Sequence, residues 1–272
     1  MSSSAASMAD YQVEAYNTAK DSENKIHDDT VARKYGFSGG LVPGVDVYAY
    51  MTHPAVQRWG RDWLERGTGD CRLIKPVYEG ATATISVQPI EGEAEAMAIT
   101  VESAGQICAT GTARLPGAAP TAPDLADFPL TALPDNRPPA SPAALPIGAM
   151  LGTYSKLCEA EAEAAYQADV REDLPLYAAE SLIHPGHLLR FGNWAVTQNV
   201  VLGPWIHVSS SVQHFATARH GEELSIRARI TNNFERKGHL FVELDAVVLA
   251  QGSRLLARMD HTAIYQPRQV QA

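Results

Sequence analysis

Hydrophobic and polar positions along the chain change their spacing in an order that predicts one long helix followed by several strands. From Val45 to Arg66, apolar side chains recur at the three- and four-residue spacing of a helix, with Pro54 as a break or kink and Gly67 as its end. Before this helix, residues 11–20 fit either an edge strand or a short helix. After it, alternation at period two predicts strands at 71–75, 81–88, 97–102 and 106–115. Glycines between these strands favour an antiparallel meander that is buried on one face and curls around the helix.

The segment 116–146 interrupts this pattern. Proline recurs every few residues in it and is interleaved with alanine. Because proline lacks a backbone N–H and fixes φ, such a density is incompatible with the interior of a helix or strand. We expect an extended linker that crosses a surface and marks a boundary between two domains.

Beyond the linker, two short sequences return at nearly the same distance from their first copies. Ile-His-Pro-Gly at 183–186 follows Leu-Val-Pro-Gly at 41–44 by 142 residues. Ala-Arg-His-Gly at 218–221 follows Val-Tyr-Glu-Gly at 77–80 by 141 residues. Two independent pairs of short sequences with nearly the same offset indicate a tandem duplication of a single fold.

The elements predicted for the second half agree with a duplication. A helix is expected over 187–200, followed by strands at 224–230, 240–249 and 255–265. The organisation expected for the chain is therefore a disordered start at 1–9, a first domain at 10–115, the linker at 116–146 and a second domain at 147–268.

Composition narrows the class of protein. The chain has 272 residues, 45% of them hydrophobic, which is enough for a well-buried core. It has no apolar run long enough to span a membrane and no pattern of a signal peptide, so we expect a cytoplasmic protein without a membrane partner. The net charge of −9 and the absence of a basic block argue against nucleic acid as a partner. Cys71, Cys108 and Cys158 are far apart and are expected to be small core residues.

The polar chemistry gathers in one short segment, residues 21–29, which combines acids, an amide and a histidine just before the first long helix. At the offset of the repeat, the counterpart of His27 is Asp169, whose neighbourhood at 170–173 has neither histidine nor asparagine. The duplication is thus expected to be asymmetric, with one such site per chain.

Other chemical motifs are weak or absent. His184 and His187 have the His-x-x-His spacing but no third ligand near them in sequence, so no metal site is predicted. Glycine-rich phosphate loops and the Gly-x-Ser-x-Gly elbow are also absent, and no cofactor is expected. The four tryptophans are expected to pack in the core or between the halves; they are Trp59, Trp63, Trp194 and Trp205.

The segment around His27 resembles a known family. Asn-Lys-Ile-His at 24–27, Asp29, Ala32, Gly-Phe at 36–37 and Pro-Gly at 43–44 resemble the MaoC-like dehydratases, the (R)-specific enoyl-CoA hydratase group of the hot-dog fold. Within residues 12–115, Lys-Pro-Val-x-x-Gly at 75–80 resembles that family too, and the tandem halves resemble its double hot-dog arrangement. The resemblance implies an α+β fold in which antiparallel sheets are each wrapped around a central helix.

The resemblance also implies roles. In the family pattern Asp-x-Asn-Pro-x-His, the acid and the histidine handle water and a proton, and a glycine N–H at a helix start polarises a thioester carbonyl. His27, Asn24 and Gly44 match the histidine, the asparagine and the glycine. Ser22 stands at the position of the aspartate, and Asp21 replaces that acid if the loop holds one extra residue.

Two further departures from the pattern are Lys25 at the proline position and Pro43 at the position of a histidine that usually precedes the glycine. Candidate catalytic residues are therefore His27, Asp21 and Asn24, and candidate oxyanion or substrate-binding residues are Gly44, Ser22 and Val42.

General chemistry supports the first of these roles. Histidine is the side chain whose unperturbed pKa lies near neutrality, so His27 can exchange protons without large tuning. A free N–H at a helix N-terminus such as Gly44 carries a partial positive charge. The expected activity is that of a hydro-lyase acting on an enoyl or 3-hydroxyacyl thioester, carried by CoA or an acyl carrier protein.

Two alternatives stay open at this point. The same fold supports an acyl-CoA thioesterase, in which water attacks the thioester carbonyl and an acid near Asn24 acts as the base. The missing in-register aspartate also fits a protein that binds an acyl group or small ligand without catalysis. A homodimer is a possible assembly for exposed sheet surfaces.

Overall fold

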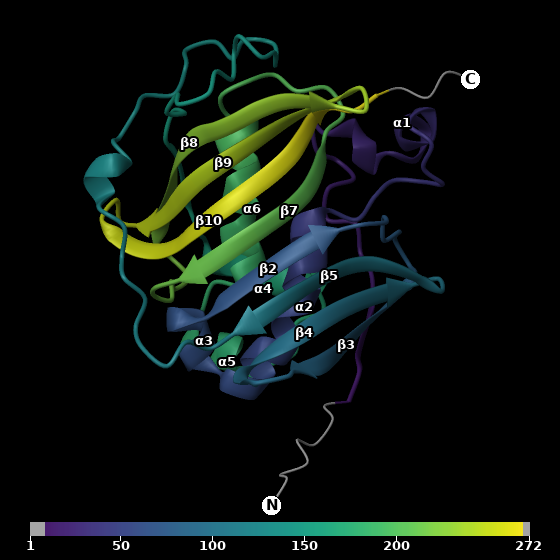
Figure 1. The fold of residues 1–272 in the computed structure, drawn as a ribbon, viewed down its shortest axis with the longest axis vertical. Coiled ribbons are helices and arrows are strands. Elements are labelled where there is room, and N and C mark those ends of the chain that lie inside the picture. Colours follow the sequence, from purple (N-terminus) through teal and green to yellow (C-terminus); the bar gives the residue numbers. More distant parts are fainter. Residues whose placement is uncertain (1–8, 269–272) are drawn as a thin grey trace, which may run out of the picture.

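A computed structural model describes residues 9–268 and places all strands in one antiparallel sheet of ten. The strands follow the order β1-β3-β4-β5-β2-β7-β10-β9-β8-β6, so the second half repeats the order of the first in reverse. Figure 1 shows this sheet as a continuous surface, with the helices behind it. The disordered start predicted for 1–9 lies outside the described residues except for Ala9.

The elements of the first half are β1 (Tyr11–Glu14), the 3-10 turn η1 (Lys25–His27), α1 (Asp29–Lys34), α2 (Gly44–Trp59), α3 (Arg61–Arg66), β2 (Thr68–Leu73), β3 (Thr82–Ile90), β4 (Glu93–Ser103) and β5 (Gln106–Arg114). Those that follow are η2 (Leu125–Asp127), β6 (Tyr154–Leu157), α4 (Ala160–Asp169), α5 (Pro175–Glu180), α6 (Pro185–Thr197), β7 (Ile206–His214), β8 (Glu223–Arg236), β9 (His239–Ala250) and β10 (Arg254–Gln266).

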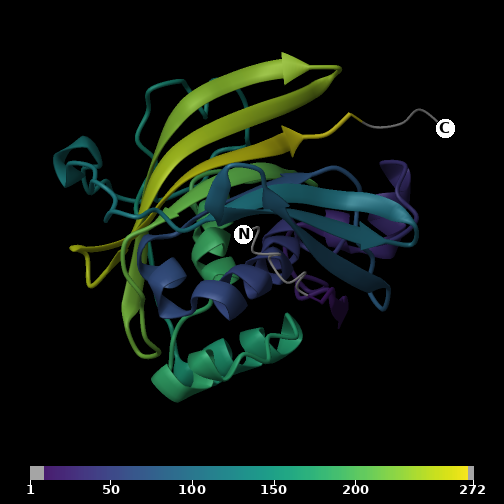
Figure 2. The ribbon, with the colours of Figure 1, turned by 60° about the horizontal axis from the view of Figure 1, so that its bottom comes forward.

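The arrangement is a double hot-dog of the α+β class, as expected. The helix α2 packs against β2, β4 and β5, α6 packs against β8, β9 and β10, and the two helices contact each other. In the view of Figure 2, the sheet curves over both helices. The helical segment that follows β6 lies on the side of these helices that faces away from the sheet. No helix among the described residues has the length and apolarity needed to cross a bilayer.

The two halves join along β2 and β7. These strands pair antiparallel, with Thr68 opposite Gln213 and Cys71 opposite Ser210. Strand β7 was not among the elements predicted from the sequence, and neither were β6, α4 and α5. Residues 11–20, for which two structures were open, begin with the edge strand β1.

The long helix of the first half differs from its prediction in where it breaks. It was expected to break or kink at Pro54, but Pro54 lies inside α2, which continues to Trp59. The break is at Gly60, whose φ of 57° and ψ of −139° are readily adopted only by glycine. α3 follows and ends before Gly67, the predicted stop.

The proline-rich segment 116–146 has no strand, and η2 is its single helical turn. It is anchored on the second half: Phe128 is buried against Val247 and Leu249, and the carbonyl of Leu145 accepts a hydrogen bond from Asn233. The linker is therefore anchored at Phe128 and Leu145, while its other residues are partly or fully exposed.

The contact between β5 and β2 leaves no room for a side chain at Gly111. A Cβ there would lie 2.0 Å from the backbone oxygen of Asp70 and 2.8 Å from the Met51 methyl. We expect Gly111→Ala to lower the free energy of unfolding by about 1–3 kcal/mol, because the backbone of one strand must shift. Urea unfolding measures this, with Gly117→Ala as the control because no atom lies within 4 Å of its Cβ position. Equal stability of the two variants would contradict the close strand contact.

His214, on β7 at the junction, is buried against Trp63, with the ring centroids 4.8 Å apart, and neither ring nitrogen has a hydrogen-bond partner among the described residues. Burial lowers the pKa of His214 to about 4. The unfolded chain therefore binds a proton that the folded chain excludes between about pH 4 and the ordinary histidine pKa of about 6.5. In this window stability rises with pH.

We expect His214→Phe to reduce this dependence. Between pH 7.5 and pH 5, the variant should lose about 2 kcal/mol less of its unfolding free energy than the unchanged protein. Urea unfolding at both pH values provides the measurement, and His239→Phe, at a partly exposed position, is the control. If the variant and the unchanged protein lose the same amount of unfolding free energy between the two pH values, His214 does not titrate in this way.

Candidate active site

Asn24 holds the start of the site in place. It caps η1, since its Oδ1 accepts a hydrogen bond from the N–H of Ile26 at 3.3 Å. The same amide pairs with the backbone of Trp205 from the other half: Oδ1 accepts from the Trp205 N–H at 3.1 Å, and Nδ2 donates to the Trp205 carbonyl at 3.0 Å. These bonds fix which end of the amide is oxygen, and they tie residues 181 positions apart.

The hydrogen bonds of His27 determine its tautomer. Nδ1 lies 2.6 Å from the carbonyl oxygen of Leu41, which can only accept, so Nδ1 carries the proton. Nε2 lies 3.2 Å from Nδ2 of Asn24, which can only donate, so Nε2 is the unprotonated nitrogen. Burial lowers the pKa of His27, against the opposing effect of the hydrogen bond to Leu41, and favours this neutral form.

Gly44 is the first residue of α2, and its N–H has no acceptor among the described residues. A Cβ at this position would lie 2.2 Å from a methyl of Leu73 and 2.7 Å from Nδ1 of His207. The close approach of these two side chains explains why only glycine fits here. The N–H of Gly44 lies at the start of α2, which is the positive end of the helix dipole.

Two cavities meet at His27 and Asn24, which line both. One, which we call the apolar chamber, has a volume of about 230 Å³, includes Gly44 and Val42 in its wall, and is otherwise lined mainly by apolar side chains such as Phe37, Leu41, Leu73, Val77, Ile206 and Ile264. The other, the polar chamber, has a volume of about 260 Å³ and is lined by Thr18, Ser22, Arg137, Arg190, Asn193 and Gln198 among others.

The structure separates the six residues singled out from the sequence. His27, Asn24, Gly44 and Val42 meet at the apolar chamber, where the backbone N–H of Val42 donates to Val77 at 2.9 Å. Ser22 lines the polar chamber.

Asp21 lies apart from this group. It is exposed and lines a third cavity, of about 680 Å³, which His27 also lines, but its carboxylate has no hydrogen bond to His27 among the described contacts.

The other acids of the segment have structural contacts. Asp28 caps α1 through the Val31 N–H at 2.9 Å, and Asp29 accepts from the Gly40 N–H at 2.7 Å. No described acidic residue lines the apolar chamber, and Glu23, whose side chain is 82% exposed, is the one acid described in the wall of the polar chamber.

Sequence reasoning missed the residues that the second half contributes. Trp205 lines both chambers while packing in the core as expected, and His207 lines the apolar chamber. Nε2 of His207 lies 2.8 Å from Oγ of Ser210, which contacts His261 at 2.9 Å, and Nδ1 of His207 has no hydrogen-bond partner among the described residues. Burial lowers the pKa of His207 to about 4.

Arg190 and Asn193 were also missed, although one signal was present. Positions 190, 193, 194 and 197 on one face of α6, together with Gln198 at its C-cap, line the polar chamber. This helix is otherwise buried. A stripe of arginine, asparagine, threonine and glutamine on it indicates that this face lines a polar cavity.

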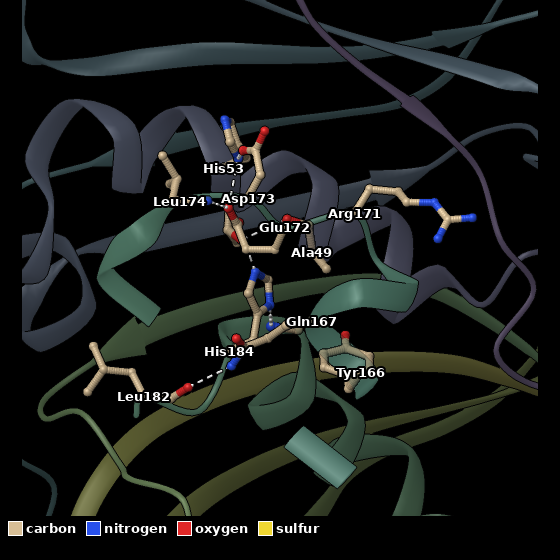
Figure 3. A network of polar contacts seen from close by, with 12 residues as sticks. Ala49, His53, Tyr166, Gln167, Arg171, Glu172, Asp173, Leu174, Leu182 and His184 are labelled. Atoms are coloured by element: carbon tan, nitrogen blue, oxygen red, sulfur yellow. Dashed lines mark hydrogen bonds and ion pairs between the residues drawn. The ribbon is translucent and has the colours of Figure 1, made fainter. Parts of the chain in front are cut away.

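A buried histidine network joins the two halves and is shown in Figure 3. Glu172 accepts hydrogen bonds from His53 at 3.0 Å and from His184 at 3.2 Å, and His184 in turn caps α6 by accepting from the Gly186 N–H. Burial works to raise the pKa of Glu172, but the hydrogen bonds from His184 and His53 hold it at about 2. This charge-assisted network links α2 to the start of α6.

Two groups of side chains bring possible metal-ligating atoms within 4.8 Å of one another: Cys158 with Glu163 and His187, and His53 with Glu172 and Asp173. In each group a histidine already bonds to a glutamate, at 2.7 Å for His187 and Glu163. His184 and His187 bond to different glutamates and so do not form one cluster.

Comparisons with known proteins show similarity in fold. No protein-family model matches the chain, and no curated protein sequence matches it. A solved MaoC-like dehydratase is 13% identical with a TM-score of 0.58, covering 94% of this chain and 98% of its own.

Two further structures are similar over most of their length. A conserved hypothetical protein of Mycobacterium tuberculosis with a double hot-dog fold is 14% identical with a TM-score of 0.57, covering 94% of this chain and 95% of its own. A protein of Novosphingobium aromaticivorans described as a candidate thioesterase is 12% identical with a TM-score of 0.53, covering 84% and 88%. The expected resemblance is therefore confirmed for the fold, and a fold of this kind is shared by dehydratases and thioesterases.

The hydrogen bond from Asn24 to His27 can be tested directly. Asn24→Asp replaces a donor at 3.2 Å from Nε2 with a carboxylate, so we expect the pKa of His27 to rise relative to that in the unchanged protein. NMR titration of labelled histidine provides the measurement. Asn233→Asp is the control, because Asn233 bonds to the backbone of Leu145 in the second half. A pKa of His27 that stays the same or falls would contradict the contact.

Proposed function

We propose that this chain is a hydro-lyase that adds water to an enoyl thioester or removes it from a 3-hydroxyacyl thioester, with CoA or an acyl carrier protein as the carrier. The observation that carries the proposal is the pair of groups in the wall of the apolar chamber. One is the unprotonated Nε2 of His27, and the other is the free N–H of Gly44 at a helix N-terminus. Such a pair supplies a base and an oxyanion donor.

The proposed reaction balances with these two groups alone. In the hydration direction, Nε2 of His27 exchanges its hydrogen bond from Asn24 for one from water, and takes a proton from that water while the oxygen bonds to the β-carbon. The electron pair of the double bond moves to the thioester oxygen, where the Gly44 N–H and the dipole of α2 stabilise the enolate. The imidazolium of His27 then returns its proton to the α-carbon, and the carbonyl is restored.

Asn24 and Trp205 act as positioning residues in this proposal. Their paired hydrogen bonds hold the amide whose Nδ2 points to Nε2 of His27. The reaction draws on no carboxylate, which accords with the absence of a described acid from the wall of the apolar chamber. Asp21, which lines a third cavity with His27 and neither chamber, has no step in it.

A second candidate is hydrolysis of a thioester. His27 as base and the Gly44 N–H beside the carbonyl oxygen also suit attack of water on the carbonyl carbon, and a candidate thioesterase is among the structures of similar fold. Release of free thiol from a saturated acyl-CoA separates the two, because hydration requires a double bond. Thiol release from a saturated acyl-CoA, with no 3-hydroxyacyl-CoA formed from a 2-enoyl-CoA, would replace the proposed activity with this one.

The role of His27 is tested by His27→Gln. We expect hydration of crotonyl-CoA and longer 2-enoyl-CoA, followed by the absorbance of the conjugated thioester, to fall by about 10²–10⁴-fold in kcat/KM. In the unchanged protein the acid limb of kcat/KM should lie below pH 6.5, because burial lowers the pKa of the base.

Two control variants sharpen this experiment. His239→Gln alters a histidine on β9 that lies in neither chamber and should leave the rate unchanged. Asp21→Asn should change the rate by no more than a few fold. Full activity in His27→Gln would remove the histidine from the mechanism, and a large loss in Asp21→Asn would show that a carboxylate is required.

A further inference from the structure

The polar chamber contains an arginine that is only partly used. Arg190 on α6 donates from Nη2 to Asp46 at 2.6 Å and to Thr18 at 2.8 Å, and its guanidinium stacks 4.7 Å from the ring centroid of Tyr166. Nε and Nη1 have no hydrogen-bond partner among the described residues. Since arginine has five N–H donors, three of them remain available at the chamber.

The ion pair with Asp46 uses one side of the Arg190 guanidinium. Asp46 has no exposed surface and also accepts hydrogen bonds from Thr18 at 2.6 Å and Tyr166 at 3.3 Å. Arg190 keeps 22% of its side chain accessible, and this surface lies in the wall of the polar chamber. A guanidinium held rigidly on one side and open on the other is suited to bind an anion.

A second arginine lines the same chamber. Arg137 donates from Nη1 to the carbonyl of Thr197 at 2.7 Å, and its acidic partner is Glu23 at 3.3 Å. Because the Glu23 side chain is 82% exposed, it can be displaced at little cost. A ligand carboxylate in this chamber would thus meet two guanidinium groups.

The order of residues along the two chambers indicates which part of a substrate carries the anion. Gly44 lines only the apolar chamber, Arg190 lines only the polar chamber, and His27 lines both. In the proposed reaction the thioester carbonyl lies at Gly44 and the reacting carbons lie at His27. The part of the acyl chain beyond the reacting carbons then extends toward Arg190.

This order excludes the phosphates of a CoA-type carrier as the bound anion. They are joined to the sulfur on the other side of the carbonyl, and the whole pantetheine arm separates them from the reacting carbons. We propose that the polar chamber binds a carboxylate at the far end of the acyl group, so that the substrates are thioesters of short dicarboxylic acids. This inference rests on the proposed function for the orientation of the acyl chain.

Binding of two unreactive CoA thioethers tests the proposal on the unchanged protein. S-(4-carboxybutyl)-CoA and S-pentyl-CoA have chains of equal carbon number, and neither has a double bond to hydrate or a thioester to hydrolyse. By titration calorimetry, we expect the carboxylated ligand to bind with a Kd at least about tenfold lower, which corresponds to about 1.4 kcal/mol. Equal affinity, tighter binding of the pentyl ligand, or no binding of the carboxylated ligand would overturn the proposal.

Variants of Arg190 test whether this residue causes the preference for the carboxylated ligand. In Arg190→Gln the two Kd values should agree within about threefold. If the glutamine variant fails to fold, Arg190→Lys takes its place, because it keeps a positive charge beside Asp46. The preference for the carboxylated ligand should be lost in this variant too, because the single ammonium group of lysine stays paired with Asp46. Arg258→Gln is the matched control: Arg258 is also paired with an aspartate, Asp245 at 2.8 Å, but it lines neither chamber, so the preference should persist.

A third ligand, free CoA, separates a carboxylate from a phosphate. If Arg190 held a carrier phosphate, Arg190→Gln would weaken all three ligands equally, and the proposal would be wrong. The experiment is also independent of the proposed reaction. A carboxylate preference without enoyl-CoA hydration would refute the activity alone, and hydration without such a preference would refute this inference alone.

Discussion

The pairing of β2 with β7 is the contact on which the rest of the molecule depends. It turns two duplicated sheets into one and brings the start of β7 beside η1 and the first turn of α2. Trp205, just before β7, then completes the hydrogen bonds of the Asn24 amide, and Asn24 in turn bonds to the ring of His27. The amide that bonds to a histidine of the first half is thus held in place by the backbone of the second half.

Much of the fold could be predicted because hydrophobic period and turn residues are local signals. The strands of the first half and β8 to β10 alternate clearly, and the repeated Pro-Gly pairs mark the starts of α2 and α6. β7 carries no such signal, since three of its four buried residues are polar: His207, Ser210 and His214 beside Val212. His207 and Ser210 bond to each other, and His214 packs against Trp63, so this strand buries polar side chains and its period does not show in hydrophobicity.

The candidate site, like the fold, could be predicted from the sequence only in part. His27, Asn24 and Gly44 lie within one short stretch of chain, so their spacing could indicate that they meet. The partners that complete them come from the other half, and no local pattern links positions as distant as Asn24 and Trp205. The acids of residues 21–29 looked alike in the sequence, yet Asp28 and Asp29 cap backbone groups, while Asp21 is exposed.

The stripe of polar residues on α6 has a consequence for how such a protein can evolve. In a dimer of identical subunits, every substitution appears at two symmetric places, so a side chain that suits one wall of a pocket is also imposed on the other. A covalent tandem removes that restriction. Here one copy supplies His27 and Gly44 and the other supplies the wall that carries Arg190, and each can vary without altering its counterpart. Duplication within one chain therefore lets the walls of two adjoining cavities change independently of each other.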